Sequence, residues 1–210
     1  MTADKNNFAY DCTGVLLAGG KNNRLPGRKK GFRTVGESRI LDQTFDLFSR
    51  VFKEVILVVN DPKAFCGYDA VVVTDMVPAG CALAGLYTGL FHARTQWIYA
   101  SACDIPFASE AVIRHLLANR KPGKEIVIPR SREGLEPLSA LYHKSCLPLM
   151  QANLEQHRYM IKKSFRPRKV WEIPPEDLEQ LDPNMRFKFN VNTPEDLARA
   201  RAMANEATVK

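Results

Sequence analysis

Near its start the chain carries the stretch Thr13-Gly14-Val15-Leu16-Leu17-Ala18-Gly19-Gly20, a short apolar run that ends in a glycine pair. A buried strand followed by a glycine turn is a common opening of a parallel α/β sheet. Glycines let backbone N–H groups approach a phosphate closely, and successive amides form an anion-binding concavity. Arg24 and Lys30 follow and add positive charge. The stretch predicts a strand that ends in a phosphate-binding loop, rather than an ordinary tight turn with exposed cations.

Outside this stretch, strand and helix patterns alternate along the chain. Apolar residues three to four apart predict a helix, and short apolar runs bounded by turn residues predict buried strands. We expect strands at 13–17, 55–59, 70–74, 97–100, 126–128 and 137–142, and helices at 38–52, through Leu83, Leu86, Leu90 and Phe91, after Ser109, at 144–155 and after Thr193. This order predicts an α/β fold with a doubly wound, mostly parallel sheet, helices on both faces and ligands beyond the carboxyl ends of the strands.

Composition is that of a soluble globular protein. The chain has 210 residues, 45% of them hydrophobic and 25% charged. We expect one domain over 1–210, frayed at about 1–11. The five cysteines are odd in number and lack a C-x-x-C pair, which favours a reducing compartment. The sequence shows neither a secretory signal nor about 20 consecutive apolar residues, so we expect a cytoplasmic protein without membrane contact.

The net charge of +7 is uneven, because basic residues cluster at 21–39 and again at 158–169. Solvated surface is the ordinary interpretation of such clusters. Nucleic-acid binding is a second, but neither cluster lies on a recognised nucleic-acid-binding motif, and we expect no nucleic-acid partner. Small polyanionic substrates are a third interpretation, under which the later cluster, with Arg166 and Arg168, faces the second substrate.

The glycine loop matches neither the G-x-G-x-x-G dinucleotide motif nor the P-loop. It resembles instead the opening of the nucleotidyltransferases, and among them the bacterial molybdenum cofactor guanylyltransferases. The resemblance covers nearly the whole chain, through 17–30, 58–60, Asp75, 79–85, 103–106, 136–138 and 190–194. It implies a Rossmann-like nucleotidyltransferase architecture and transfer of GMP from magnesium GTP to the terminal phosphate of molybdopterin, with release of pyrophosphate. It also implies transient contact with molybdoenzyme maturation proteins.

The resemblance assigns nucleotide-binding roles to several residues. Main-chain groups of Leu17, Ala18, Gly19 and Gly20 would contact the nucleotide, and Lys30, with Arg24, would neutralise the triphosphate. Asn60 and Asp75 each follow a predicted strand and match further nucleotide contacts in the family. For Asn60 taken alone, a turn residue that ends a strand is the more ordinary interpretation.

Asp104 is the candidate metal-binding and catalytic carboxylate. It follows a predicted strand and precedes Ile105-Pro106. A single carboxylate suits Mg²⁺, a hard cation that keeps most of its waters and bridges phosphate oxygens. Asn190 and Asn192 match a family pair on the acceptor side, although turn chemistry before the helix cap at Thr193 stays open as the alternative.

Three positions depart from the family pattern: Pro26 replaces a glycine, Lys29 replaces an acidic residue, and Cys81 stands where a glycine is usual. Proline lacks an N–H, so one phosphate contact would be lost. Two other functions therefore stay open. One is the same chemistry with another specificity, as in a molybdopterin cytidylyltransferase or a sugar-phosphate nucleotidyltransferase. The other is a non-catalytic nucleotide-binding module.

Overall fold

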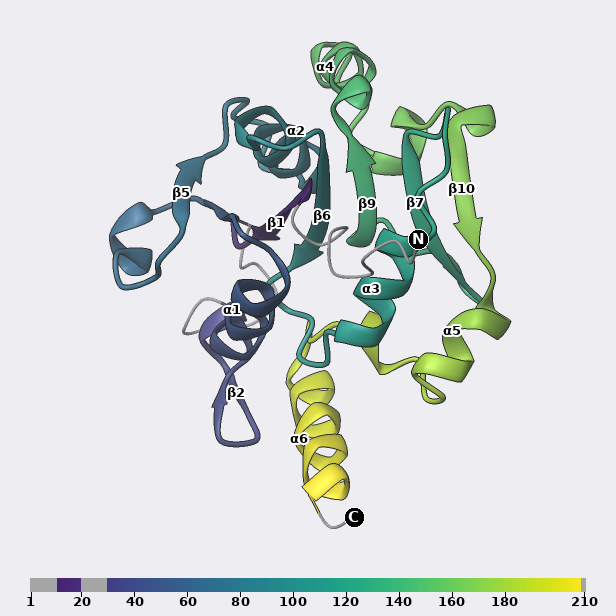
Figure 1. The fold of residues 1–210 in the computed structure, drawn as a ribbon. Helices are drawn as coiled ribbons and strands as arrows, with labels where there is room; N and C mark the ends of the chain where they lie inside the picture. Colours follow the sequence, from purple (N-terminus) through teal and green to yellow (C-terminus); the bar gives the residue numbers. More distant parts are fainter. Residues whose placement is uncertain (1–10, 20–29, 209–210) are drawn as a thin grey trace.

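A computed structural model of the chain describes residues 11–19 and 30–208 (Figure 1). Its main sheet has the order β10-β7-β9-β6-β1-β4-β5, with β8 paired to β7. Neighbours run parallel except at β9, which is antiparallel to β6 and β7, and in the β7–β8 hairpin. The bounds are β1 (Cys12–Leu17), β4 (Val55–Val59), β5 (Val71–Thr74), β6 (Trp97–Ala102), β7 (Ile126–Ser131), β8 (Gly134–Leu135), β9 (Ser139–His143) and β10 (Val170–Ile173). The mostly parallel α/β sheet is confirmed.

Helices connect the strands. The α-helices are α1 (Ile40–Val51), α2 (Ala82–His92), α3 (Glu110–Ala118), α4 (Leu147–Glu155), α5 (Pro175–Leu181) and α6 (Pro194–Thr208). Short 3-10 turns are η2 (Lys30–Phe32), η3 (Pro62–Phe65), η4 (Lys144–Cys146), η5 (Ile161–Ser164), η6 (Pro167–Lys169) and η7 (Arg186–Lys188), and β2 (Thr34–Val35) pairs with β3 (Ser38–Arg39). None of these helices combines the length and apolar character that crossing a bilayer requires.

Two apolar cores lie on opposite faces of the sheet. Successive strand residues point to opposite faces, so Leu16 joins the core under α1, α3 and α5, while Val15 joins the core under α2 and α4. Figure 1 shows α2 and α4 on the side of the sheet away from α1 and α3. Helices therefore cover both faces, which confirms the doubly wound arrangement.

Glycine allows α2 to pack closely on the central strand. A Cβ on Gly89 would lie 2.4 Å from Cγ1 of Val15, closer than real Cβ atoms approach other atoms. The close approach brings the start of α2 to the carboxyl end of β1. The helix thereby becomes one wall of the space beyond the strands.

The structure corrects some of the expected elements. Phe91 does not belong to the buried stripe of α2, because its position on the helix leaves it 50% exposed. The last sheet strand, β10, and the following α5 were not predicted, since Val170–Ile173 is short and follows a basic, proline-containing stretch. The expected strand at 137–142 begins only at Ser139. The predicted cap of α3 is confirmed, because Ser109 Oγ accepts a hydrogen bond from the Val112 amide.

Candidate functional site

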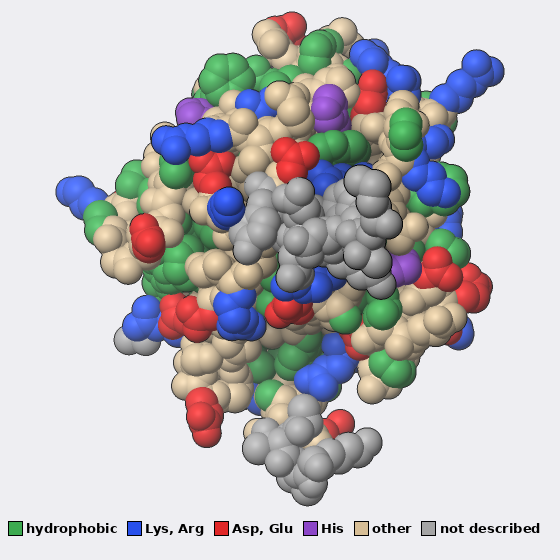
Figure 2. Space-filling model, viewed as in Figure 1, with side chains coloured by type: hydrophobic (Ala, Val, Ile, Leu, Met, Phe, Trp, Pro, Cys, Tyr) green, Lys and Arg blue, Asp and Glu red, His purple; other side chains and the backbone are tan. Residues whose placement is uncertain are grey.

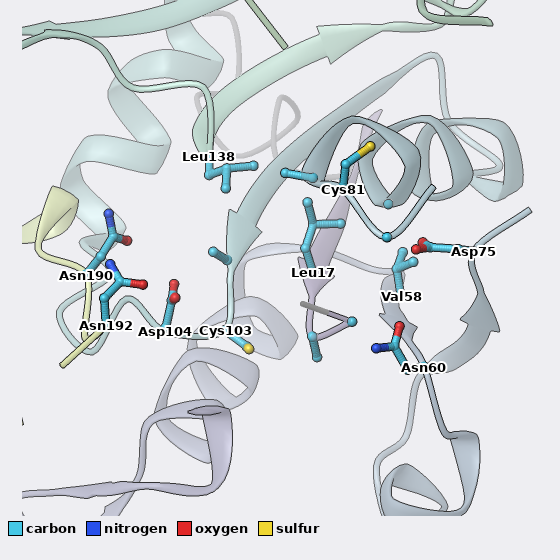
Figure 3. A pocket seen from close by; sticks show the side chains of 16 residues that line it. Leu17, Val58, Asn60, Asp75, Cys81, Cys103, Asp104, Leu138, Asn190 and Asn192 are labelled. Carbon is cyan, nitrogen blue, oxygen red and sulfur yellow. The ribbon is translucent and has the colours of Figure 1, made fainter. Parts of the chain in front are cut away.

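A cavity of about 490 Å³ lies beyond the carboxyl ends of β1, β4 and β6, where the topology predicts ligand binding. This volume is within the usual range for small-molecule sites. Figure 3 shows its walls. The lining residues are Leu17, Ala18, Gly19, Val58, Asn60, Asp75, Gly80, Cys81, Ala82, Gly85, Ala102, Cys103, Asp104, Leu138, Asn190 and Asn192. Eight of the eleven candidate residues proposed from the sequence therefore line one cavity: Leu17, Ala18, Gly19, Asn60, Asp75, Asp104, Asn190 and Asn192.

The end of β1 is held between its two neighbouring strands. The Ala18 amide donates a 2.8 Å hydrogen bond to the Val58 carbonyl, and the Cys103 amide donates a 3.1 Å bond to the Leu17 carbonyl. Gly19 then passes directly beside Asn60, since a Cβ on Gly19 would lie 2.8 Å from Asn60 Oδ1. The backbone of the predicted loop and the Asn60 amide thus form one surface.

Asp75 follows β5 and lies beside the first turns of α2. Its Oδ1 is buried and has no hydrogen-bond partner among the described residues. A Cβ on Gly85 would lie 3.5 Å from the same oxygen. Burial raises the pKa of the Asp75 carboxyl above its usual value. A buried polar atom without a partner costs free energy, and a ligand that donates a hydrogen bond to Asp75 would remove this cost.

The start of α2 forms the wall beside Asp75. Gly80 has a φ of +58°, a conformation that glycine adopts without strain, and Cys81 is the N-cap residue of the helix. The Cys81 side chain makes no capping hydrogen bond. This departure from the family pattern therefore lies on the cavity wall itself.

Asp104 joins the cavity to a distant part of the chain. The Val191 amide donates a 2.9 Å hydrogen bond to the Asp104 carbonyl. This bond holds the segment that contains Asn190 and Asn192 against the end of β6. In Figure 3 the side chains of Asn190 and Asn192 lie beside the Asp104 carboxylate, at the opposite end of the cavity from Asn60 and Asp75.

A capping box fixes the direction of the segment as it enters α6. Thr193 Oγ1 accepts a 3.1 Å hydrogen bond from the Asp196 amide, and Asp196 Oδ2 accepts bonds from the Asn192 and Thr193 amides at 3.1 Å and 2.9 Å. Such reciprocal bonds satisfy the first amides of a helix. The predicted cap at Thr193 is confirmed, and it coexists with the placement of Asn192 at the cavity.

The cavity residues fit a metal ion carried by a substrate better than a resident one. Among residues 11–19 and 30–208, no three His, Cys, Asp or Glu side chains are grouped so as to hold a metal. Mg²⁺ is commonly bound by one or two carboxylates together with substrate phosphates and water. Asp104, with two amide side chains beside it, supplies the oxygen ligands of that kind of site.

Part of the predicted loop lies outside the described residues, namely Gly20, Arg24, Pro26 and Lys29, as do residues 1–10 of the expected frayed terminus. Lys30 is described only in its backbone, as the first residue of η2. The adjacent Gly31 packs on the end of β6, because a Cβ there would lie 3.3 Å from Cβ of Cys103. The loop thus rejoins the fold next to Asp104.

The Arg166 part of the later basic cluster lies at the amino edge of the sheet. β10 and β7 are parallel and begin together, with Val170 paired to Ile126. Arg166 forms a 3.5 Å ion pair with Glu125, just before that start. It therefore lies at the amino edge, opposite the cavity, and the expectation that Arg166 and Arg168 face a second substrate there is wrong. Figure 2 shows Lys and Arg interspersed with Asp and Glu on the viewed face.

Sequence reasoning assigned no individual role to several lining residues. Gly85 and Leu138 lie in stretches that resemble the family. The position of Gly85 after a turn and that of Leu138 before a strand were the sequence signals that could have placed them at the cavity. Gly31 shows no such signal, because its close contact with Cys103 depends on tertiary packing.

Comparison with known proteins finds relatives over most of the chain. A family model described as a MobA-like NTP transferase domain matches residues 14–169. The molybdenum cofactor guanylyltransferase of Desulfosudis oleivorans is 34% identical over 90% of this chain and 94% of its own length. A probable molybdenum cofactor guanylyltransferase from Pelotomaculum thermopropionicum is 31% identical over 93% and 94% of the two chains.

A solved structure resembles the fold closely. The molybdopterin-guanine dinucleotide biosynthesis protein A of Archaeoglobus fulgidus matches with a TM-score of 0.80 and 26% identity, over 92% of this chain and 99% of that one. The likeness extends over nearly the whole of both chains. The predicted nucleotidyltransferase architecture is thereby confirmed.

Proposed function

This chain belongs to the MobA-like NTP transferase family, and we propose that it transfers GMP from GTP to the terminal phosphate of molybdopterin. The observation that carries the proposal is one cavity that brings together the end of β1, Asp75, Asp104 and the segment around Asn190. The two relatives reported above are named for this activity, and this chain matches nearly their full length.

The two ends of the cavity suit the two substrates. We define the nucleotide end by Gly19, Asn60 and Asp75, and the acceptor end by Asp104, Asn190 and Asn192. At the nucleotide end, main-chain groups of residues 17–20 would hold the nucleotide, while amide and carboxylate oxygens can accept hydrogen bonds from a base. At the acceptor end, amides can bind phosphate or pterin edges without adding negative charge.

The reaction needs positioning and charge neutralisation more than acid–base chemistry. An oxygen of the acceptor phosphate attacks the α-phosphorus of GTP, the bond from that phosphorus to the bridging oxygen breaks, and pyrophosphate leaves. The attacking oxygen is already anionic, so no protein base is required. Lys30 and Arg24 would neutralise the triphosphate, and Asp104 would hold Mg²⁺. When bound, Mg²⁺ supplies Lewis-acid stabilisation of the phosphate charge.

We further propose that residues 1–210 form one domain. The family model ends at residue 169, yet β10 joins the same sheet, and Asn190 and Asn192 line the same cavity. None of the five cysteines forms a disulfide, which fits a reducing, cytoplasmic environment. Transient contact with proteins that mature molybdoenzymes would follow from the product, which such enzymes use.

Pyrophosphate release tests the function. The protein is incubated with Mg²⁺ and each of GTP, CTP, ATP and UTP, with and without molybdopterin. We expect release with GTP only when molybdopterin is present. Preference for CTP would indicate a cytidylyltransferase, and binding of triphosphate without turnover in any mixture would indicate a non-catalytic module.

A further inference from the structure

The described walls of the cavity lack a cation for the acceptor. Among the described lining residues, the charged ones are Asp75 and Asp104, and both are acidic. Under the proposed function, on which this inference rests, the acceptor brings a terminal phosphate with up to two negative charges. Removing such a group from water is costly unless a cation or several donors replace the water. A positive side chain close to Asn190 and Asn192 would add to the charge that Mg²⁺ at Asp104 supplies.

Lys188 is the basic residue nearest to Asn190 in the sequence. It ends η7 and stands two residues before Asn190. Phe189 between them is extended, and two residues of extended chain span at most about 7 Å, which a lysine side chain can bridge. The Lys188 side chain is only 20% exposed. Partial burial lowers the pKa of Lys188, as expected for an ammonium partly withdrawn from water.

The partner of Lys188 belongs to a small acidic group beside the cavity. Lys188 Nζ pairs with the carboxylate of Glu133. The Ser131 hydroxyl lies 2.9 Å from a Glu133 carboxylate oxygen and 2.7 Å from one of Glu136. One hydroxyl has one proton, so it can donate to only one of the two carboxylates at a time. Lys188 offsets the repulsion between them.

This group adjoins the cavity from a second direction. Glu136 stands two residues before Leu138, which lines the cavity. The Ser139 amide donates a 3.2 Å hydrogen bond to the Glu136 carbonyl, so a tight turn separates the acidic group from the lining residue. Lys188 is thus two residues from one lining residue, Asn190, and its ion-pair partner belongs to a group that ends two residues from another, Leu138.

We propose that Lys188 binds the terminal phosphate of the acceptor and that Glu133 is its exchangeable partner when no acceptor is bound. The exposures of the two side chains favour this exchange, because Glu133 is 72% exposed and can return to water while the mostly covered Lys188 stays in place. A phosphate dianion carries more charge than a carboxylate and so competes well for the ammonium. Glu133 acts as a competitor of the acceptor.

Opposite effects of the two partners test the proposal. The variants are Lys188→Gln, Lys188→Arg and Glu133→Gln, with Lys169→Gln as a control, because Lys169 pairs with Glu125 at the amino edge of the sheet. We measure KM for molybdopterin and for GTP from pyrophosphate release, and molybdopterin affinity without GTP by fluorescence titration. Thermal unfolding of each variant reports stability.

We expect Lys188→Gln to raise KM and Kd for molybdopterin about tenfold or more, the effect of losing one charge-assisted hydrogen bond, with KM for GTP unchanged. Lys188→Arg should restore most of the affinity. Glu133→Gln should lower KM for molybdopterin about two- to threefold, because the competing carboxylate is gone. Lys169→Gln should leave all three constants unchanged.

A structural ion pair would behave differently. In that case Lys188→Gln and Glu133→Gln would both lower the unfolding temperature and leave molybdopterin affinity within about twofold of wild type, which overturns the proposal. Failure of the proposed function would be seen earlier, because the wild-type protein would then neither bind molybdopterin nor release pyrophosphate with it. If the wild type turns over and the variants all have the same KM and Kd for molybdopterin, only the proposed role of Lys188 is wrong.

Discussion

The two ends of the cavity are built in different ways. The nucleotide end is formed by neighbouring parallel strands, where Gly19 leaves no room for a Cβ beside Asn60 and Gly85 lies beside Asp75. The acceptor end depends on the segment around Asn190, far from Asp104 in the sequence, which a backbone hydrogen bond from Val191 holds to Asp104. We infer that shape, fixed by the sheet, selects the nucleotide, whereas charge and amides on a later segment select the acceptor.

The largest effect on the rate should come from Asp104, the acceptor-end carboxylate that would hold Mg²⁺. Asp104→Asn removes the charge that would hold Mg²⁺ against the phosphates, and loss of one such electrostatic contact typically costs about 10²- to 10³-fold in rate. We expect kcat with GTP and molybdopterin to fall by about 10³-fold. The Asn side chain keeps the shape, and the bond from Val191 uses the main chain, so the unfolding temperature should change little.

Retention of activity within tenfold of wild type would contradict this role for Asp104. Titration with Mg²⁺ adds a second measurement, because the variant should require a higher Mg²⁺ concentration for half-maximal rate. The two readouts together distinguish loss of metal binding from loss of folding.

Gly19→Ala should affect the nucleotide end alone. The new Cβ would lie 2.8 Å from Asn60 Oδ1, which is the end of a flexible side chain and can move at little cost in stability. Moving it removes the amide from its position beside the loop. We expect KM for GTP to rise about tenfold, the effect of about one hydrogen bond, with KM for molybdopterin unchanged.

Gly89→Ala is the matched control for a glycine in close contact away from the cavity. Its Cβ would collide with Val15, a stiff core side chain, so the variant should lose about 1–3 kcal/mol of stability while KM for GTP stays near wild type. Equal changes of KM for GTP in the two variants would indicate a general effect of packing and would weaken the comparison between the ends.

Asp75→Asn should make the folded protein more stable and weaken nucleotide binding. Burial raises the pKa of Asp75 in the folded protein, so ionisation costs the folded state stability as the pH rises from the usual aspartate pKa of about 3.9 through the raised value. The neutral variant avoids this loss. Its unfolding temperature should exceed that of wild type at pH 7, and the difference should shrink at pH 4.5.

The same variant should bind GTP about tenfold more weakly, because a charge-assisted acceptor is replaced by a neutral amide. Calorimetric titration with GTP measures this loss. A variant that is both less stable and fully able to bind GTP would show that the Asp75 carboxylate is a structural group.

Much of the fold could be predicted because its patterns are local. The apolar run before Gly19 and the pentad Val55–Val59 each specify a strand by themselves, and parallel pairing then brings their carboxyl ends together. For the same reason Asn60, Asp75 and Asp104 could be placed at one edge from their positions after strands. The positions of Asn190 and Asn192 came from family resemblance, since nothing local links them to Asp104.

The remainder depends on tertiary contacts. In the sequence Gly31 is an ordinary loop glycine, and only the structure shows its close contact with Cys103. In the same way Lys188 is an ordinary lysine in the sequence, and only the structure shows its ion pair with Glu133. The prediction that Arg166 and Arg168 face the second substrate was wrong because a run of charged residues does not indicate at which edge of a sheet it lies. Only the pairing of Val170 with Ile126 reveals that Arg166 lies at the amino edge.

The smallest effect should come from that amino edge. Arg166→Gln with Arg168→Gln removes two positive charges, yet β7 separates them from the cavity by its length, roughly 17–20 Å for six residues. The Debye length at physiological salt is about 8 Å, so their field at the acceptor end is largely screened. We expect KM for molybdopterin within twofold of wild type at 150 mM salt. A larger rise would mean that the acceptor extends around the sheet edge, and the division into a shape-selecting and a charge-selecting end would then have to include this cluster.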